Sequence, residues 1–255
     1  MTKYNICWLT ATYGRITCLQ RNIKCFLDQD YTGKHLMFIA NTGKPIEKIE
    51  EIYPKDKLIT IFNYSEYAFK SVGEKYQQAV KDIMTLYPGI EVIISADDDD
   101  IFLPNHLTEG NKGMNRAYEV GALAYKPQFS YFRSNEGIIR NENVYEPSMF
   151  IDADYLSKTG FAPVSIRYHQ QWLDPLVRDS KILVDPNGVS TFIYNWGDPW
   201  GVYKMSGRSL DDRWNFEQHR KSSLDMGNGI ITPTPDNSSY YNEIKFVKLN
   251  LENSK

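Results

Sequence analysis

The stretch of residues 91–104 reads EVIISADDDDIFLP and carries the clearest indication of the fold. Its first five residues form a short apolar run rich in β-branched side chains, which is typical of a buried central strand. Four aspartates at residues 97–100 follow directly. They are therefore expected at the carboxyl end of that strand, which is where ligands of open α/β sheets bind. The stretch predicts an α/β fold with a polar site at residues 97–100.

The chemistry of the acidic run favours a bound cation. Four adjacent carboxylates repel one another and resist desolvation, unless a cation neutralises them or water reaches them. Mg²⁺ and Mn²⁺ prefer carboxylate oxygens and share their remaining positions with substrate phosphates. A solvated acidic turn fits poorly between the apolar runs at 92–94 and 101–103. A calcium-binding loop fits the acidic run less well than a Mg²⁺ or Mn²⁺ site does, because Phe102 stands where such a loop needs glycine.

The chain before the acidic run alternates short apolar runs with amphipathic stretches, which predicts βαβ units and a mostly parallel sheet. The helix with the clearest signals begins with Ser71 and Glu74, which form a capping box, and ends before Pro88. Strands are expected at residues 4–9, 36–40, 58–62 and 91–95, and helices at residues 16–28 and 71–86.

The chain after about residue 120 shows strands at hairpin-like spacing. Strands are expected at residues 121–125, 129–133, 138–144, 182–184 and 191–194, with a helix at 168–178. The segment after Asp225 is rich in Gly, Pro, Asn and Ser, which is typical of a loose arm or lid. We expect one domain over residues 1–225, followed by this arm at 226–255.

Composition narrows the class of protein. The 255 residues include 42% hydrophobic side chains, enough for one sizeable α/β core. The 29 basic and 32 acidic residues give a net charge of -3, without the basic excess of a dedicated nucleic-acid binder. Three cysteines, Cys7, Cys18 and Cys25, match no zinc spacing and leave one unpaired in any disulfide scheme. With no apolar run of about 18 residues, a cytoplasmic protein without a transmembrane segment is expected.

Three segments together resemble family 2 glycosyltransferases of the GT-A fold. They are residues 10–15 (TATYGR), residues 26–31 (FLDQDY) and residues 97–104 (DDDDIFLP). Members of that family have a Thr-Tyr-Asn-Arg-like turn after the first strand and a Gln-x-Tyr at the end of the first helix. They also carry an Asp-x-Asp motif shortly before a proline. The resemblance covers residues 4–107 well and residues 147–178 loosely.

The resemblance implies a GT-A (Rossmann-like) fold, in which helices flank a mostly parallel central sheet beside a smaller mixed acceptor-side subregion. Residues 1–107 would bind the nucleotide sugar and residues 108–225 the acceptor. The implied activity is transfer of a hexosyl or pentosyl group from a nucleotide-sugar donor, with a UDP-sugar as the best guess. Mn²⁺ or Mg²⁺ would be the cofactor. The acceptor stays open between a glycan, a lipid-linked sugar, a protein side chain and a modified nucleobase in DNA.

The resemblance also assigns roles to single residues. Those implied to bind the donor are Thr10, Thr12, Tyr13, Arg15, Lys70, Lys75, Asp97 and Asp98. Those implied to bind the metal are Asp99, Asp97, Asp100 and, from the C-terminal region, His219. The chain departs from the family pattern at the residue that would contact the nucleobase of the donor. Asn41 stands where the family commonly has an aspartate that accepts a hydrogen bond from uracil. An amide can donate as well as accept, so uracil is not assured.

The sequence does not identify a single residue as the catalytic base. Inverting members usually supply it from a Glu-Asp pair at the start of a late helix, where this chain has Gln170 and Gln171. Glutamine cannot act as a general base near neutral pH. Asp174, His169 and Asp152 are therefore the candidates, with Asp174 favoured. A retaining reaction, which needs no such base, is the alternative to an inverting one.

Aromatic residues in the second half suggest an acceptor platform. Trp196 and Trp200 lie among turn residues, which predicts that their indole rings are partly exposed. Because sugar faces stack on aromatic rings, both residues and Trp172 are predicted to bind the acceptor.

Two other functions fit parts of the sequence. A nucleotidyltransferase also uses strand-end carboxylates and a metal, but residues 12–15 (TYGR) are a poor version of its Gly-rich basic loop. A catalytically silent nucleotide-sugar-binding protein is favoured by Gln170 and Gln171, which cannot supply a base.

Overall fold

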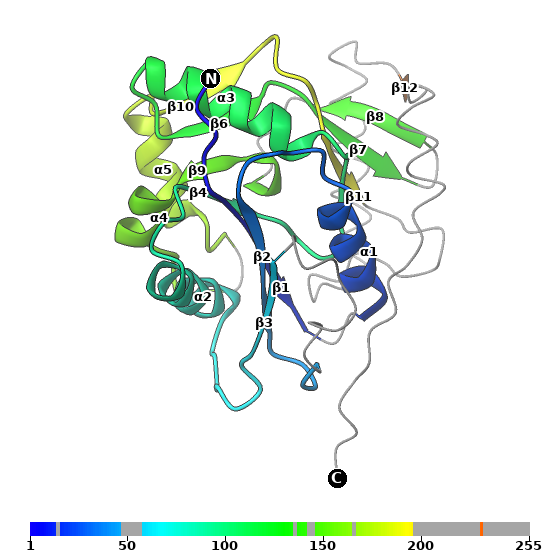
Figure 1. The fold of residues 1–255 in the computed structure, drawn as a ribbon, viewed down its shortest axis with the longest axis vertical. Coiled ribbons are helices and arrows are strands. Elements are labelled where there is room, and N and C mark those ends of the chain that lie inside the picture. The colour runs from blue at the N-terminus through cyan, green and yellow to red at the C-terminus, as the bar shows by residue number, and fades with distance from the viewer. Residues whose placement is uncertain are drawn as a thin grey trace.

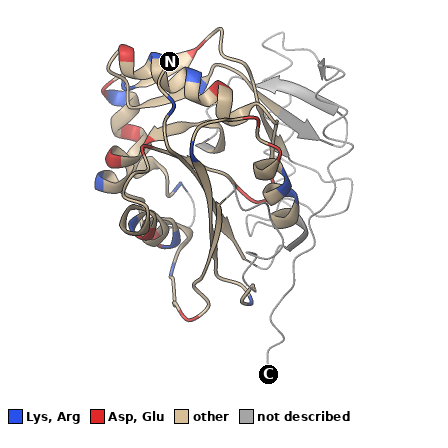
Figure 2. Cartoon of the chain, in the orientation of Figure 1, with Lys and Arg blue, Asp and Glu red and all other residues tan. Residues whose placement is uncertain are grey.

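The computed structural model describes residues 1–13, 16–46, 58–134, 137–141, 146–164, 167–195 and 230–231. Figure 1 shows a central sheet with helices on both sides and a smaller second sheet next to it. Among the described residues no helix combines the length and apolar character needed to cross a membrane. Figure 2 shows Lys and Arg interspersed with Asp and Glu on this part of the chain.

The larger sheet has seven strands in the order β10, β6, β9, β4, β1, β2, β3. Its strands are β1 (Ile6–Thr12), β2 (His35–Asn41), β3 (Leu58–Asn63), β4 (Val92–Ser95), β6 (Ala124–Pro127), β9 (Phe150–Asp152) and β10 (Ile182–Asp185). Within the described chain β9 runs antiparallel to both of its neighbours, and the other pairs are parallel. The expected mostly parallel sheet is confirmed.

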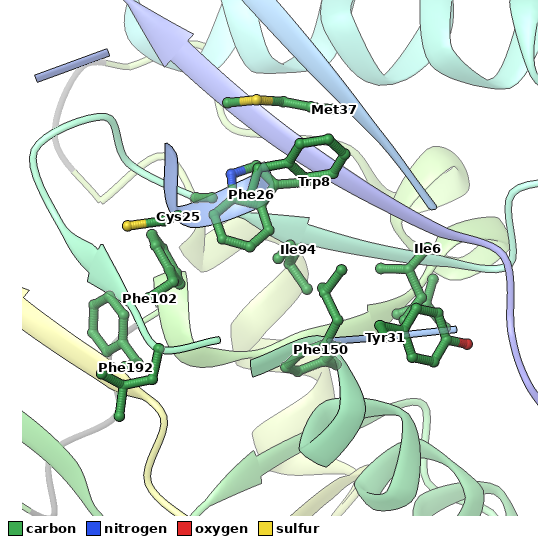
Figure 3. Close-up of a cluster of buried hydrophobic side chains, with 14 of the residues drawn as sticks. Ile6, Trp8, Cys25, Phe26, Tyr31, Met37, Ile94, Phe102, Phe150 and Phe192 are labelled. Atoms are coloured by element: carbon green, nitrogen blue, oxygen red, sulfur yellow. The ribbon is translucent and has the colours of Figure 1, made fainter. Parts of the chain in front are cut away.

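Two layers of helices cover the sheet. On one face lie α1 (Ile16–Leu27) and α3 (His106–Glu119), and on the other lie α2 (Val72–Leu86), α4 (Ala153–Thr159) and α5 (Gln170–Arg178). Successive residues of a strand point to opposite faces, so Trp8 joins the first core while Cys7 and Leu9 join the second. Figure 3 shows Trp8 beside Phe26 and Phe102, whose ring centroids lie 5.8 and 4.6 Å away. Both faces are therefore buried, as the continuous apolar strands predict.

The smaller sheet has the order β12, β8, β7, β11, β5. Its strands are β5 (Ile101–Phe102), β7 (Ser130–Ser134), β8 (Gly137–Asn141), β11 (Phe192–Asn195) and β12 (Ile230–Ile231), and a 3-10 turn, η2, spans Glu146–Ser148. β5 directly follows the acidic run and pairs antiparallel with β11. The acidic run therefore connects β4 of the larger sheet to β5 of the smaller one.

Some predicted boundaries differ from the structure. The first strand, expected at residues 4–9, is β1 and extends to Thr12, because it pairs with β2 along its whole length. Hairpin-like spacing correctly describes β7 and β8, whereas β6 pairs in parallel with the distant β10. The helix expected at 168–178 begins at Gln170. The arm predicted at 226–255 lies outside the described residues apart from β12.

The N-terminal cap of α2 closely matches the predicted capping box of Ser71 and Glu74. Ser71 is the N-cap, and its Oγ accepts a hydrogen bond from the N–H of Glu74 at 3.1 Å. The Glu74 carboxylate accepts in turn from the N–H of Lys70, one residue before the position in a standard capping box. The first bond satisfies one of the unpaired N–H groups at the start of the helix, and the second holds the residue that precedes the N-cap.

Gln29 links the elements around the acidic run. Its amide donates to the carbonyls of Cys25, at the end of α1, and Leu103, just after β5, each at 2.9 Å. Its oxygen accepts from the N–H of Leu107 in the first turn of α3, also at 2.9 Å. All of these groups are buried, so one amide fixes where two helices meet the chain that leaves the acidic run.

Candidate metal centre and its surroundings

The acidic run forms a tight turn at the carboxyl end of β4. The N–H of Asp100 donates to the carbonyl of Asp97 at 3.3 Å and closes the turn. One carboxylate oxygen each from Asp97, Asp99 and Asp100 lie within 4.8 Å of one another. Asp99 and Asp100 are buried, and Asp97 is partly exposed. Three hard oxygen donors that converge in this way fit one Mg²⁺ or Mn²⁺ ion.

Asp98 has a different environment from its three neighbours. It is fully buried, and its Oδ2 accepts a hydrogen bond of 2.6 Å from the hydroxyl of Thr12, the last residue of β1. The bond ties the acidic turn to the adjacent strand. Thr12 and Asp98, both predicted to bind a donor, therefore contact each other within the protein.

Helix α1 holds the backbone of the turn. Arg21 donates from Nη2 to the carbonyl of Asp99 at 2.7 Å, and Asn22 donates from Nδ2 to the carbonyl of Asp97 at 3.0 Å. Both side chains are buried. Fixing these two carbonyls limits where the attached carboxylates can lie. The sequence prediction missed this pair, although two adjacent polar residues next to Ile23 on an otherwise apolar helix face are a signal for such a role.

Asn22 also accepts two hydrogen bonds from β1. Its Oδ1 lies 3.0 Å from both Trp8 Nε1 and Thr10 Oγ1. Thr10 is fully buried in this network. Thr10 is predicted to line a nucleotide pocket, and in this structure its hydroxyl faces α1 inside the core.

Lys75 brings a positive charge to the edge of the sheet where the acidic run lies. Its Nζ is 3.4 Å from the carbonyl of Thr12 and 3.3 Å from the hydroxyl of Thr42, at the carboxyl ends of β1 and β2. The side chain is only 8% exposed. Tyr13 is 73% exposed directly after β1, and Lys70 is exposed before α2. Of the two lysines predicted to bind a donor, Lys75 is the one seen to contact this edge of the sheet, at Thr12 and Thr42.

Asn41 supports the turn that follows β2. Its Oδ1 accepts from the N–H of Gly43 at 2.9 Å, and its Nδ2 donates to the carbonyl of Lys44 and to Asn63 Oδ1, each at 2.8 Å. The residue is buried. Both ends of the amide are therefore used within the chain, and the contact between Asn41 and a nucleobase stays a prediction.

Asp152, which is predicted as a candidate catalytic base, lies away from the acidic run. It caps α4: Oδ1 accepts from the N–H of Tyr155 and Oδ2 accepts from the hydroxyl of Tyr118, each at 2.8 Å. In the sheet it pairs with Val92, the first residue of β4, whereas the acidic run follows Ser95, the last. Three residues of strand separate these two levels by about 10 Å. The cause is the antiparallel direction of β9, which places its end at the opposite edge of the sheet.

The other predicted residues of the second half lie on or beside α5. Trp172, which is predicted to bind the acceptor, is fully buried in the core beside Phe161. Asp174 is exposed on α5, and His169 is half-buried at the N-cap of that helix. Arg15, Trp196, Trp200 and His219 lie outside the described residues.

A cluster of three aromatic rings lies between the acidic run and the residues just before α5. Tyr76 on α2 stacks on Tyr168, with ring centroids 5.1 Å apart, and on Phe161, at 5.3 Å. The Tyr76 hydroxyl donates to Asp97 Oδ1 at 3.0 Å. Burial, reinforced by the charge of Asp97, raises the pKa of the Tyr76 hydroxyl well above its usual value. The sequence prediction missed this role, because Tyr76 falls on the apolar face of α2 and looks like an ordinary core residue.

Gly73 allows this cluster to form. A Cβ at this position would lie 1.8 Å from the carbonyl oxygen of Ala162, which is far inside contact distance. The N–H of Gly73 also donates to the carbonyl of Val164 at 3.1 Å. The first turn of α2 therefore packs directly on residues 161–164, and only glycine permits that approach.

Several solved structures resemble this chain in fold. No protein-family model and no curated protein matches the chain. TarS 1-349 from S. aureus matches with a TM-score of 0.56 at 10% identity, over 75% of this chain and 60% of that chain. The same protein in complex with UDP-GlcNAc gives 0.57 at 12% identity, over 89% and 68%. The mannosyltransferase PcManGT from Pyrobaculum calidifontis, in complex with GDP-Man and Mn²⁺, gives 0.58 at 12% identity, over 92% and 67%.

Identities of 10% to 12% establish a shared fold and no more. The chain spans 60% of the length of the TarS 1-349 chain. The expected fold class is confirmed: a mixed α/β chain with a mostly parallel central sheet, flanking helices and a smaller second sheet, as in these glycosyltransferases.

Proposed function

We propose that the protein is a metal-dependent glycosyltransferase. It moves a sugar from a nucleotide-sugar donor to an acceptor hydroxyl, with a UDP-sugar as the first donor to test and inversion as the expected outcome. The observation that carries the proposal is the convergence of Asp97, Asp99 and Asp100 at the carboxyl end of β4. Two proteins of the same fold support it, since TarS was solved with UDP-GlcNAc and PcManGT with GDP-Man and Mn²⁺.

The residues around the turn suit the chemistry of such a transfer. A divalent ion held by the three aspartates would offset the negative charge that develops on the departing diphosphate. Lys75 adds a positive charge at the same edge of the sheet. Tyr13 offers an exposed ring on which a nucleobase could stack. Donor recognition is thus assigned to the ends of β1, β2 and β4.

The base that removes the acceptor proton is assigned to His169 ahead of Asp174. The His169 ring lies 5.6 Å from the ring of Tyr168, which stacks on Tyr76, the partner of Asp97. Asp174 lies on α5 and is exposed to solvent. His169 is therefore connected to the metal centre through Tyr168 and Tyr76, and histidine is the side chain that most often acts as a general base.

The test of the proposal is a donor panel. We expect calorimetry to detect binding of UDP-GlcNAc, UDP-glucose or GDP-mannose, and mass spectrometry to detect release of the nucleoside diphosphate with a panel of hydroxyl acceptors. EDTA should abolish turnover, and added Mn²⁺ or Mg²⁺ should restore it. Turnover that is indifferent to chelation would contradict the metal assignment. Binding without turnover would favour a silent binding protein, and pyrophosphate release from nucleoside triphosphates would favour a nucleotidyltransferase.

Stereochemistry is tested on the same reaction. NMR of the product formed with the active donor should show the anomeric configuration opposite to that of the donor, as inversion requires. Retention of configuration would replace the inverting proposal and would remove the need for His169 as a base.

Replacing Lys75 should weaken donor binding. Lys75→Met keeps the aliphatic stem but removes the charge, and loss of one charge-assisted hydrogen bond to phosphate should raise the donor Kd by about tenfold. Calorimetry in the presence of Mn²⁺ measures this change. Lys81→Met is the matched control, because Lys81 is exposed on the same helix and away from the strand ends. Equal donor affinity in both variants would exclude Lys75 from the donor site.

A further inference from the structure

Asp97 differs from the other two aspartates that converge in the turn. Asp99 and Asp100 are buried, so surrounding atoms restrict their side chains, whereas Asp97 is partly exposed. An exposed side chain has more rotamers to lose when it binds an ion. Its Oδ1 accepts the hydroxyl of Tyr76 at 3.0 Å, and this bond selects one orientation of the carboxylate.

Tyr76 is itself held rigidly. Its ring is 1% exposed and packs against Phe161 and Tyr168, at interplanar angles of 27° and 14°. The helix that carries it is anchored at Gly73 against residues 161–164. The hydroxyl therefore has little freedom to move away from Asp97.

We infer that Tyr76 is a positioning residue of the metal centre: its hydroxyl orients the Asp97 carboxylate for the ion, and the rings of Phe161 and Tyr168 keep it in place. The inference rests on the proposed function, since it assumes that the three aspartates bind a metal. Groups that hydrogen-bond to metal ligands fix ligand orientation, and their loss typically costs about 10- to 100-fold in metal affinity. Tyr76 stands in that relation to Asp97.

The test removes one hydroxyl group. Tyr76→Phe preserves the ring stacking and deletes the bond to Asp97, together with the hydrogen bonds that link the Tyr76 hydroxyl to the side chains of Ser95 and Tyr168. Mn²⁺ binding to the full chain, without any donor, is measured from the EPR signal of free Mn²⁺. We expect the Mn²⁺ Kd to rise by about 10-fold or more. The matched control is Tyr64→Phe, which deletes another buried tyrosine hydroxyl that donates to an aspartate, Asp82, further along the same helix α2. Its Kd should equal that of the unmodified protein.

The outcomes separate the inference from the proposed function. If the unmodified protein binds Mn²⁺ and Tyr76→Phe binds it equally well, Tyr76 has no positioning role and the metal centre stands. If both variants lose affinity to the same extent, the effect is general and the inference is overturned. If the unmodified protein binds no Mn²⁺, the metal centre fails and the inference fails with it.

A second variant covers the case in which Tyr76→Phe does not fold. Phe161→Leu removes a ring that packs on Tyr76 but leaves both hydrogen-bonding groups in place. Mn²⁺ affinity should then fall by a smaller factor than the loss of the hydroxyl would cause. Unchanged affinity would show that the ring cluster does not act on the metal centre.

Discussion

Replacing Asp99 by asparagine should lower metal-dependent turnover by about 10³-fold while leaving the fold intact. Asn has nearly the same shape as Asp but lacks the negative charge that a divalent ion requires of its ligand. The loss of several kcal/mol of charge stabilisation in the transition state corresponds to a rate effect of this size. The turn should survive, because Arg21 holds the backbone carbonyl of Asp99, which the substitution keeps.

The measurement combines kinetics with thermal melting. kcat/KM is determined with the active donor, and the melting temperature is recorded with and without Mn²⁺. The metal-free variant should be at least as stable as the unmodified protein, because one of several mutually repelling carboxylates is gone. Mn²⁺ should raise the melting temperature of the unmodified protein only, since a ligand stabilises the state that binds it.

Asp154→Asn is the control for this substitution. Asp154 lies in the first turn of α4, its side chain is 69% exposed, and it pairs with Lys158 on the surface. Surface pairs of this kind contribute little, so turnover should not change. Undiminished turnover of Asp99→Asn would reject Asp99 as a metal ligand.

Replacing Asn22 by alanine should reduce the free energy of unfolding by about 3 to 5 kcal/mol. The amide joins Trp8 Nε1, Thr10 Oγ1 and the carbonyl of Asp97, and the three side chains of this network are fully buried. Each buried polar group left without its partner costs about 1 to 3 kcal/mol, and a rotating hydroxyl recovers part of that loss. Urea denaturation, followed by tryptophan fluorescence, measures the change.

Asn115→Ala is the matched control for Asn22. Asn115 on α3 also makes three hydrogen bonds, two with the backbone of Thr2 and one with that of Asn111. Its bonds to Thr2 are exposed, so water can replace Asn115 as a partner, and the cost should stay below about 1 kcal/mol. Similar losses in the two variants would contradict the view that Asn22 is a buried junction between α1, β1 and the acidic turn.

The position of the acidic run at the end of a central strand could be predicted, because it depends only on the residues next to it in the sequence. A β-branched run must be buried on both faces, so residues 92–95 form a central strand and the aspartates fall at its end. The start of α2 was equally readable, since Ser71 and Glu74 satisfy nearby backbone donors. Local patterns of this kind require no knowledge of which strands are adjacent.

The division of labour within the site could not be predicted in the same way. Asp98 differs from its neighbours because Thr12, 86 residues earlier, reaches its carboxylate. Asp152 lies away from the acidic turn because β9 runs antiparallel, which no local pattern in residues 150–152 reveals. The bonds from Asn41 to Asn63 and from Thr10 to Asn22 could not be predicted either, since these partners come from other elements.

The sequence by itself determined the fold class and a cluster of acids at a strand end, because burial and charge repulsion act over a few neighbouring residues. Only the tertiary structure decided which acids converge and what holds them. Asp97, Asp99 and Asp100 converge in a turn whose carbonyls at Asp97 and Asp99 are held by α1, while β1 engages Asp98 and α2 contributes Tyr76. Hydrogen bonds are short and directional, so their partners are known only once strands and helices distant in the chain are packed together.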